Sequence, residues 1–449
     1  MALFGTDGVR GVANDTLTAE LAYRVAGAVG ARLGPGARVL IGRDTRVSGP
    51  MLEAASVAGL TEAGVETVSL GVAPTPAVAA LVPRCHAQAG LVISASHNPP
   101  EYNGLKWLAG DGRKWPEAVE ADVARAVDRG VRGRVPSMDL GAWRAWPEAL
   151  EQYRSRLVGL FAGRVPKVRA VVDLAHGAAG VTAPEVLERL GIACDVWYGE
   201  PRGALINRQC GATHPEVLAH AVRVTGADIG FAFDGDADRV MVADGSGRIL
   251  NGDAVLYLLA LGMRAEGRLR EDRVVATVMS NLALEHALAA HGIAMERTPV
   301  GDRWVADRMA ETGAVLGGEQ SGHIILADWA VTGDGLLTAL AVLAEMQRSG
   351  RPASELAVDL TPYPQLLKNV KLGQIPPDWD ERPEIKEAVR ACAADLGADG
   401  RVFIRPSGTE PLLRIMLEGR DVDRIQSWAD RLAAVVQEVL ESATEPLGQ

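Results

Sequence analysis

Short apolar segments of strand character alternate with segments of helical periodicity through about the first 360 residues of this chain. Such alternation predicts parallel β-sheets covered by helices. It repeats in three rounds of similar length, which predicts three related α/β domains. The predicted strands span residues 38–42, 65–70, 89–94, 169–173, 193–197, 229–233 and 273–278. The predicted helices span 51–63, 115–128, 148–160, 214–224, 254–265 and 282–291, with further helices from Ala183 and after Gly301.

The pattern changes beyond Thr361-Pro-Tyr-Pro364, a proline-rich segment that is typical of a stiff joint. The segments that follow predict a smaller α+β unit. They are a strand (366–372), a helix (383–394), two strands (401–405 and 412–418) and a helix (422–441). A chain of 449 residues has room for three or four domains of about 100–150 residues. We expect domain ranges of 1–148, 149–250, 251–361 and 362–449.

Composition excludes several classes of protein. The net charge of −11 argues against a nucleic-acid partner held by a broad basic face. No lysine follows a glycine, so the chain has no P-loop for a nucleotide. The four cysteines are too far apart for a C-x-x-C motif, and neither a leader-like N-terminus nor an apolar run of about 18 residues is present. We expect a cytoplasmic protein without a membrane partner.

Three carboxylates at alternate positions follow the predicted strand 229–233. They are Asp234, Asp236 and Asp238. Clustered carboxylates raise one another's pKa unless a cation neutralises them, and their hard oxygen atoms suit Mg²⁺ or Ca²⁺. An EF-hand would need glycine at the sixth position and glutamate at the twelfth, where this chain has Arg239 and Gly245. The segment therefore predicts a metal site at a strand end, and Arg239 fits a site that also holds a phosphate.

A serine lies in a sharp turn directly after the predicted strand 89–94, in the segment Ser94-Ala-Ser-His-Asn-Pro99. A serine in such a place is often only a turn or a cap. Here His97 follows Ser96, and the Asn98-Pro99 turn can expose the hydroxyl. The segment is not a G-x-S-x-G elbow, which disfavours a hydrolase serine. Ser96 is instead a candidate to carry a phosphoryl group.

The segment between the last two predicted strands has the composition of a phosphate cradle. Its donors and its turn glycine are Arg405, Ser407, Gly408, Thr409 and Arg414. A plain hairpin turn would explain the glycine and the prolines but not two arginines with two hydroxyls.

Two weaker features complete the set. The segment Gly317-Gly-Glu-Gln-Ser-Gly-His323 gathers polar side chains suited to sugar hydroxyls. Arg10, Arg43 and Arg303 lie in Gly-rich or Asp-rich segments, although each alone is compatible with a surface ion pair. A phosphoryl-accepting hydroxyl, a hard-metal site and a separate phosphate cradle together indicate phosphoryl transfer on a substrate that already carries a phosphate.

These motifs, in this order along the whole chain, resemble those of the α-D-phosphohexomutases, and most closely the phosphoglucosamine mutases of bacteria. Ser94–Pro99 looks like the phosphoserine loop, Asp234–Arg239 like the metal loop, Glu319–His323 like the sugar-binding loop and Arg405–Arg414 like the phosphate-binding loop. Residues 4–11, 207–216, 300–305 and 363–370 are similar to the phosphoglucosamine mutases. Residues 99–106 are instead similar to phosphomannomutase/phosphoglucomutase relatives, which leaves that activity as the alternative within the family.

The resemblance implies a fold and a reaction. The fold is three similar α/β domains with mixed sheets and a C-terminal TATA-binding-protein-like α+β domain around a central cleft, each domain contributing one loop. The reaction is the interconversion of glucosamine 6-phosphate and glucosamine 1-phosphate through a phosphoserine enzyme and a 1,6-bisphosphate, which feeds UDP-N-acetylglucosamine synthesis. One Mg²⁺ per chain, a hexosamine or hexose 1,6-bisphosphate as activator, and a homodimer are also implied.

The resemblance assigns roles to individual residues. Ser96 would carry the phosphoryl group and, with Asp234, Asp236 and Asp238, hold the metal. Arg10 and Arg239 would hold the group in transfer, and Lys106, or else His323 or His97, would act as general acid or base, for which a lysine needs a lowered pKa. The expected substrate-binding residues are Glu319, Ser321, His323, Arg303, Arg405, Ser407, Gly408, Thr409 and Arg414.

Two other classes of function remain open from sequence. A metal-dependent phosphatase would hydrolyse the phosphate on Ser96 and release it steadily without converting isomers. A non-enzymatic phosphosugar-binding protein would require neither Ser96 nor all three aspartates.

Overall fold

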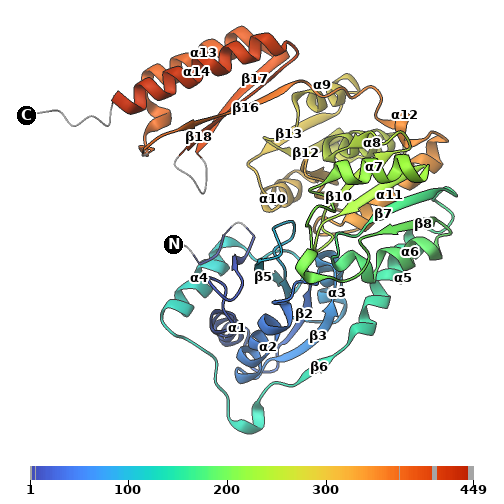
Figure 1. The fold of residues 1–449 in the computed structure, drawn as a ribbon. Coiled ribbons are helices and arrows are strands. Elements are labelled where there is room, and N and C mark those ends of the chain that lie inside the picture. The colour runs from blue at the N-terminus through green and yellow to red at the C-terminus, as the bar shows by residue number, and fades with distance from the viewer. Residues whose placement is uncertain (1–2, 6, 374, 407–411, 443–449) are drawn as a thin grey trace, which may run out of the picture. The chain divides into compact units, whose positions relative to one another are not determined.

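The computed structural model describes the whole chain except residues 1–2, 6, 374, 407–411 and 443–449, and it divides into two compact units (Figure 1). Unit 1 comprises residues 1–280 and 291–358, and unit 2 comprises 281–290 and 359–449. Within the described residues, unit 1 contains three β-sheets and unit 2 contains one. The three predicted rounds of α/β structure therefore lie in unit 1, except for residues 281–290 of the third round.

The first sheet of unit 1 has six strands in the order β1-β5-β4-β2-β3-β6. They are β1 (Val9–Val12), β2 (Arg38–Arg43), β3 (Glu66–Val72), β4 (Ala89–Ile93), β5 (Tyr102–Ala109) and β6 (Trp143–Ala145). The pairs β2–β3, β2–β4 and β3–β6 are parallel, whereas β5 is antiparallel to β4 and β1. The alternation alone predicted a parallel sheet, but this sheet is mixed. The reason is that the segment 94–101, between β4 and β5, is too short for the crossover connection that parallel strands require.

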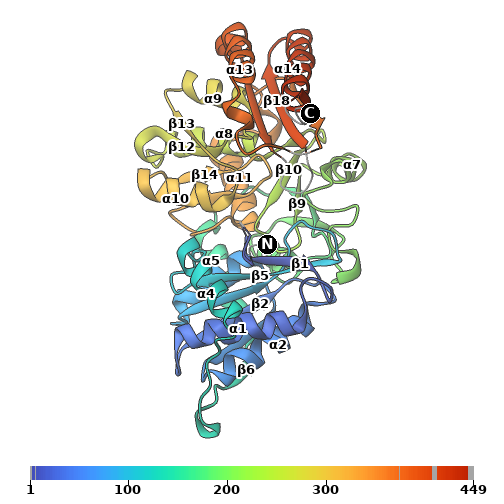
Figure 2. The same ribbon diagram turned by 90° about the vertical axis from the view of Figure 1, so that its left-hand side faces the viewer.

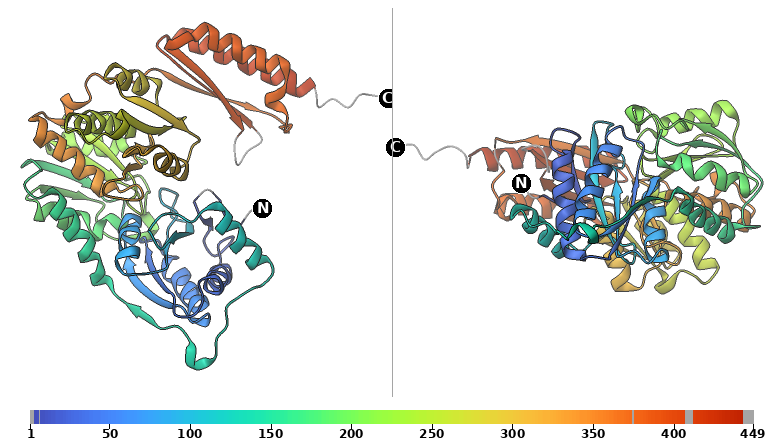
Figure 3. Two further views of the ribbon diagram at one scale, coloured as in Figure 1. Left: turned by 180° about the vertical axis from the view of Figure 1, so that it is seen from behind. Right: turned by 90° about the horizontal axis from the view of Figure 1, so that it is seen from below.

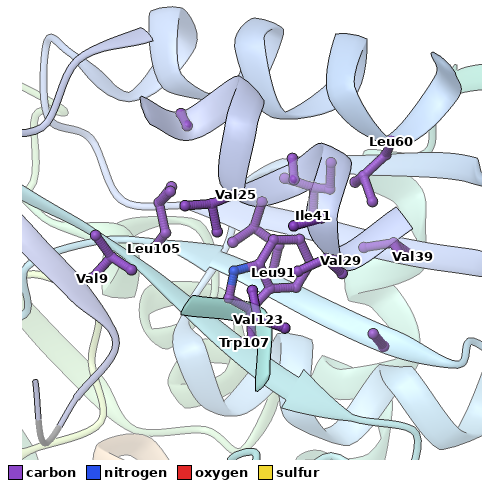
Figure 4. Packing of buried hydrophobic residues seen from close by; sticks show 14 of the residues in the cluster. Val9, Val25, Val29, Val39, Ile41, Leu60, Leu91, Leu105, Trp107 and Val123 are labelled. Atoms are coloured by element: carbon purple, nitrogen blue, oxygen red, sulfur yellow. The ribbon is translucent and has the colours of Figure 1, made fainter. Parts of the chain in front are cut away.

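Four helices belong to this first sheet: α1 (Ala19–Leu33), α2 (Gly49–Glu62), α3 (Thr75–Arg84) and α4 (Glu117–Asp128). Helices α1 and α2 lie side by side (Figure 2). Small residues permit this approach, because a Cβ atom at Gly30 would lie 2.5 Å from the Cβ of Ala63. The core that they cover includes Val25, Ile41, Leu91, Trp107 and Val123, drawn from helices and strands alike (Figure 4).

The second sheet has the order β11-β10-β9-β7-β8. Its strands are β7 (Arg169–Asp173), β8 (Ala193–Trp197), β9 (Ile229–Phe233), β10 (Val240–Asp244) and β11 (Ile249–Leu250), and its helices are α5 (Leu150–Phe161), α6 (Ala183–Arg189) and α7 (Pro215–Thr225). Every residue of β9 is buried, and β9 returns directly into antiparallel β10 through residues 234–239. Figure 3 shows, from behind, the long segment with β6 that joins α4 to α5.

The third sheet has the order β13-β12-β14-β15. Its strands are β12 (Arg273–Thr277), β13 (Ala294–Thr298), β14 (Leu316–Gly318) and β15 (Ile324–Leu326), and its helices are α8 (Gly252–Ala265), α10 (Asp302–Thr312), α11 (Gly335–Ser349) and α12 (Ala353–Leu356). Strand β12 is parallel to β13 and β14, and β14 is antiparallel to β15. The turn between β14 and β15 consists of residues 319–323. In each of the three sheets, one of the predicted loops therefore connects two neighbouring antiparallel strands.

Unit 2 is the predicted α+β unit. Its elements are α9 (Leu282–Ala290), β16 (Gln365–Lys371), α13 (Pro383–Leu396), β17 (Gly400–Pro406), β18 (Leu412–Gly419) and α14 (Val422–Ser442). The three strands form an antiparallel sheet in the order β16-β18-β17, and a core that includes Cys392, Leu417 and Leu432 joins it to α13 and α14. Helix α9 groups with this unit although its sequence lies within the third round. Among the described residues, none of the helices has both the length and the apolar character that crossing a membrane requires.

Candidate active site

The serine loop begins where β4 ends. Ser96 is buried and has a backbone φ of 52°, which a residue with a side chain adopts only when its surroundings impose it. Its N–H donates to Ser94 Oγ over 2.8 Å, and Ser94 Oγ in turn donates to Asp44 Oδ2 over 2.6 Å. The turn thus directs the Ser96 hydroxyl away from the strand and into the site.

The Ser96 hydroxyl has two polar neighbours. Its Oγ donates to Asp234 Oδ2 over 2.6 Å, and His97 Nδ1 lies 3.3 Å from the same Oγ. Burial, together with Arg239 and Arg10, lowers the pKa of His97 to about 4, so its ring is neutral at pH 7. The structure thus brings Ser96, His97 and the aspartate loop together.

The aspartate loop packs against the serine loop through a glycine. A Cβ atom at Gly235 would lie 2.7 Å from the carbonyl oxygen of Ser96, so only glycine permits this approach. Each of the three predicted aspartates offers one carboxylate oxygen to a group whose members all lie within 4.8 Å of one another, and all three residues are buried. The three carboxylates therefore converge on one point, as the sequence predicted.

The charge of this cluster fits a hard divalent cation. Burial raises the pKa of Asp234 well above its ordinary value, and the nearby charges of Asp238 and Asp236 raise it further. One carboxylate oxygen each of Asp236 and Asp238 is buried without a hydrogen-bond partner in the described structure. Oxygen donors at this spacing with unused acceptor capacity match the coordination that Mg²⁺ prefers.

Lys106, on β5, extends into the aspartate cluster. Its Nζ lies 2.8 Å from Asp236, 3.1 Å from Asp7 and 3.9 Å from Asp238. Burial alone would lower the pKa of Lys106, but these carboxylates outweigh it and raise the pKa above its ordinary value. Lys106 is therefore a firmly held ammonium in this arrangement, whereas a role as base would require the opposite shift.

A chain of charged residues extends the cluster to the third sheet. Asp7 accepts from Arg10 and Lys114 and forms an ion pair with Lys106. Lys114 in turn lies 2.6 Å from Asp302 at the start of α10. The ring of His323 lies 3.6 Å from both Asp238 and Asp302. Burial would lower the pKa of His323, but Asp238 and Asp302 outweigh it and raise the pKa.

Two arginines beside Ser96 have unused donors. The buried Nε atoms of Arg10 and Arg239 have no hydrogen-bond partner in the described structure. The Arg239 backbone N–H donates to Asp234 over 3.2 Å, and its Nε lies 3.9 Å from Asp238. Because both guanidinium charges act on His97, both lie near the serine loop. Their free donors suit an anion bound at Ser96.

The predicted sugar-binding turn is attached to the aspartate loop. Glu319 is buried and accepts from the Gly301 N–H over 3.1 Å, and Ser321 Oγ lies 3.4 Å from its carboxylate. The Val240 N–H donates to the Gly322 carbonyl over 3.1 Å, which joins this turn to the strand that follows the aspartates. The backbone therefore holds these two loops side by side.

Arg303 has a different environment from the one its predicted role implies. Its guanidinium donates to Glu120 on α4 over 2.8 Å and lies 3.5 Å from Glu117. These described contacts join α10 to α4. They are not contacts with Ser96, the aspartates or Glu319.

The predicted phosphate cradle lies in unit 2. Arg405 on β17 and Arg414 on β18 are directly opposite in the antiparallel register, so their side chains share one face of the sheet. Ser407, Gly408 and Thr409 lie outside the described residues.

Several residues at the site were not predicted from sequence. Besides Asp7, Lys114 and Asp302, they include Asp44, Arg46, Thr75 and Asn207. Thr75 Oγ1 donates to Asp236 over 2.6 Å. In the segment 42–49 the sequence drew attention to Arg43, but Arg43 pairs with Glu53 over 3.0 Å, and it is Arg46 that contacts the serine loop. The spacing of Asp44 and Arg46, two positions apart, was the available signal.

Models of the phosphoglucomutase/phosphomannomutase family match four segments in order. They are the alpha/beta/alpha domain I (1–133), domain II (150–247), domain III (251–363) and the C-terminal domain (367–435). The phosphoglucosamine mutase of Desulforamulus reducens is 45% identical over 440 residues, which cover 97% of this chain and 99% of that protein.

Solved structures have the same fold. A phosphoglucomutase/phosphomannomutase family protein from Burkholderia thailandensis matches with a TM-score of 0.82 at 26% identity, over 97% of both chains. The N-acetylphosphoglucosamine mutase of Aspergillus fumigatus, solved in complex with GlcNAc-6P and magnesium, matches in fold with a TM-score of 0.61 at 20% identity, over 89% of this chain and 82% of that one. The chain therefore belongs to the α-D-phosphohexomutases, the phosphoglucomutase/phosphomannomutase family of isomerases, within their phosphoglucosamine mutase group.

Proposed function

We propose that this isomerase interconverts glucosamine 6-phosphate and glucosamine 1-phosphate, with Ser96 as the carrier of the phosphoryl group. The observation that carries the proposal is the 2.6 Å hydrogen bond from the Ser96 hydroxyl to Asp234, in a cluster of three carboxylates. The relative from Desulforamulus reducens, named a phosphoglucosamine mutase, supports the amino-sugar substrate.

The reaction takes two transfers. In the first, the bond between phosphorus and Ser96 Oγ breaks as a bond forms to the oxygen of the free sugar hydroxyl. The sugar hydroxyl loses its proton, Ser96 Oγ takes up a proton, and a 1,6-bisphosphate results. After the bisphosphate turns over, the bond between its other phosphorus and the sugar oxygen breaks as a bond forms to Ser96 Oγ. Ser96 Oγ loses its proton, and the sugar oxygen takes up a proton. A hexosamine or hexose 1,6-bisphosphate would also phosphorylate Ser96 initially and so act as the activator.

The site residues then take the following roles. Asp234, Asp236 and Asp238, with an oxygen on Ser96, would hold one Mg²⁺, which supplies charge neutralisation when bound. The unused Nε donors of Arg10 and Arg239 would bind the phosphoryl oxygens. His97 is neutral and 3.3 Å from Ser96 Oγ, which supports it as a proton acceptor there, whereas Lys106 would be the general acid or base by family resemblance.

The substrate is held by the remaining predicted residues. Glu319 and Ser321, with His323, would bind the sugar hydroxyls. Arg405 and Arg414, with Ser407, Gly408 and Thr409, would bind the phosphate that is not in transfer. For Arg303 we propose an indirect role in substrate binding, through the ion pair with Glu120.

We place the reaction in the cytoplasm, upstream of UDP-N-acetylglucosamine synthesis, with the phosphosugar as partner and a homodimer as the assembly. Four free cysteines, three of them buried, support a reducing compartment. The domain ranges 1–148, 149–250, 251–361 and 362–449 belong to the same proposal.

The test is a comparison of substrates. The purified chain, with Mg²⁺ and a trace of hexose 1,6-bisphosphate, is given glucosamine, glucose or mannose 6-phosphate, and the 1-phosphate is measured by ³¹P NMR. We expect the highest kcat/KM for glucosamine 6-phosphate. A preference for glucose or mannose would favour the phosphomannomutase/phosphoglucomutase alternative, and steady phosphate release without isomer would favour a phosphatase.

The role of Ser96 is tested in the same assay. Ser96→Ala should abolish turnover, whereas Ser137→Ala, at an exposed serine, should not change it. Substantial activity in Ser96→Ala would reject Ser96 as the carrier.

A further inference from the structure

The backbone of the serine loop converges on one buried guanidinium. Arg46 has no exposed surface, and all five of its N–H donors have acceptors. Its Nη2 donates to the carbonyls of Ser96 (3.0 Å) and Asn98 (2.7 Å), its Nη1 to those of Tyr102 (2.8 Å) and Pro99, and its Nε to Asp44 Oδ2 (2.9 Å). A single side chain thus satisfies four carbonyls of the segment 96–102.

These carbonyls need such a partner. The segment between β4 and β5 lacks regular structure at its centre. The Pro99 carbonyl also accepts from the Tyr102 N–H over 3.1 Å, but no described backbone N–H donates to the carbonyls of Ser96 and Asn98, and an unsatisfied buried carbonyl costs about 1–3 kcal/mol. Ser96 also has its strained φ of 52°. Asp44 balances the Arg46 charge and, through Ser94 Oγ, also supports the Ser96 N–H. The Arg46–Asp44 pair therefore holds Ser96 at both its carbonyl, through Arg46, and its N–H, through Asp44 and Ser94.

We propose that Arg46 is a positioning residue for Ser96: it sets the place of the Ser96 hydroxyl for phosphoryl transfer without contacting sugar or phosphate. The inference rests on the proposed role of Ser96 as phosphoryl carrier. A small displacement of the Ser96 oxygen slows phosphoryl transfer but does not change how the other loops bind the substrate. Loss of Arg46 should therefore lower kcat and leave KM unchanged.

Asn207 gives a second, weaker support from the neighbouring domain. Its Nδ2 donates to the same Ser96 and Asn98 carbonyls, over 2.8 and 3.1 Å. Its backbone φ is 58°, which glycine also adopts without strain. Asn207→Gly therefore removes two donors to the loop without changing the charge or the backbone.

The test compares two conservative variants of neighbouring arginines. Arg46→Lys keeps the charge but offers three donors in place of five, whereas Arg43→Lys keeps an ion pair with Glu53 that lies outside the loop. We expect Arg46→Lys to lower kcat for glucosamine 6-phosphate by at least about tenfold while KM stays within about twofold, with Arg43→Lys close to wild type. The single-turnover rate of phosphoryl transfer from the phosphorylated enzyme should fall by the same factor. Both rates are measured at a temperature well below the melting temperature of the variant.

Hydrogen exchange gives a readout without activity. The amides of residues 94–103 should exchange faster in Arg46→Lys than in Arg43→Lys, with the rest of unit 1 unchanged. Equal exchange and equal kcat in the two variants would overturn the inference, and so would a rise in KM that accounts for the whole loss. If the wild type is inactive, the proposed function fails, and exchange alone decides whether Arg46 positions the loop. If Arg46→Lys does not fold, Asn207→Gly is measured in its place, with a smaller fall in kcat and faster exchange in 94–103 expected.

Discussion

The hydroxyl of Ser96 and the carboxylate of Asp234, 138 positions apart in the chain, form a 2.6 Å hydrogen bond. It joins the loop after β4 of the first sheet to the loop after β9 of the second. Because burial and two further carboxylates raise the pKa of Asp234, the negative charge there is incompletely compensated by the protein alone. Lys106 lies 2.8 Å from Asp236, and the cation that acts on Asp234 is Arg239.

A divalent cation should therefore stabilise the folded chain measurably. We expect Mg²⁺ to raise the melting temperature of the wild type, because a ligand that binds only the folded state stabilises it. Asp236→Asn should raise the Mg²⁺ concentration at the midpoint of the thermal-shift titration by at least about tenfold. In the wild type, removal of Mg²⁺ by a chelator should stop turnover. Asp111→Asn, at an exposed position, serves as the control. An unchanged midpoint in Asp236→Asn would remove that residue from the ligand set.

A methyl group at two glycines should have opposite effects. Gly235→Ala places a Cβ atom 2.7 Å from the Ser96 carbonyl and should separate the two loops, with loss of turnover. Gly159→Ala, on the exposed face of α5 with no atom within 4 Å of the new Cβ, should stabilise the chain by up to about 1 kcal/mol. Urea unfolding measures the stability of Gly159→Ala, and the mutase assay measures the turnover of Gly235→Ala. Full activity in Gly235→Ala would contradict the close packing of the loops.

The sequence predicted the elements whose side chains show a clear period. The run 229–233 is β9 to the residue, and the five-element order of the tail was confirmed. Helix α1 was not predicted because its alanines, with Gly27 and Gly30, obscure the apolar face, although Gly30 fits against the end of α2. Helix α3 was not predicted because Pro76 and Pro83 look like breakers, although a proline in the first helical turn needs no partner.

The site was predictable where its chemistry lies in short segments and not where it depends on folding. Asp234, Asp236 and Asp238 are spaced for one metal within a single turn, and Ser96 lies at a strand end. Asp302, in contrast, reaches the cluster through the ring of His323 and through Lys114, which is 188 positions away, and such pairings leave no trace in the local sequences.

Two opposed arginines should make unit 2 sensitive to anions. Arg405 and Arg414 face each other on adjacent strands, where like charges are destabilising unless an anion lies between them. We expect Arg405→Gln to raise KM for glucosamine 6-phosphate by about tenfold, with a smaller change in kcat. Arg420→Gln, at an exposed arginine of the same unit, is the matched control and should leave KM unchanged. Equal KM values in the two variants would argue against this phosphate site.

A buried carboxyl at the start of α11 should make stability depend on pH. Asp334 is 2% exposed, accepts from Tyr153 Oη and caps α11 through the Leu337 N–H, each over 2.9 Å. Burial raises its pKa to about 6, from the ordinary 3.8, and the hydrogen bonds offset this only in part. The folded state therefore binds the proton more tightly than the unfolded state does. Its contribution to stability is complete below pH 4 and is lost as the pH rises through 6.

Asp334→Asn removes this titration, because the amide oxygen can still cap α11 and accept from Tyr153. The free energy of unfolding of the variant relative to wild type should rise between pH 4 and 7 by up to about 3 kcal/mol, the equivalent of the pKa difference. Asp139→Asn, whose carboxylate is exposed, should show no such trend. Denaturant unfolding across this pH range measures it, and parallel curves for the wild type and Asp334→Asn would mean that Asp334 is ionised in the folded state at little cost.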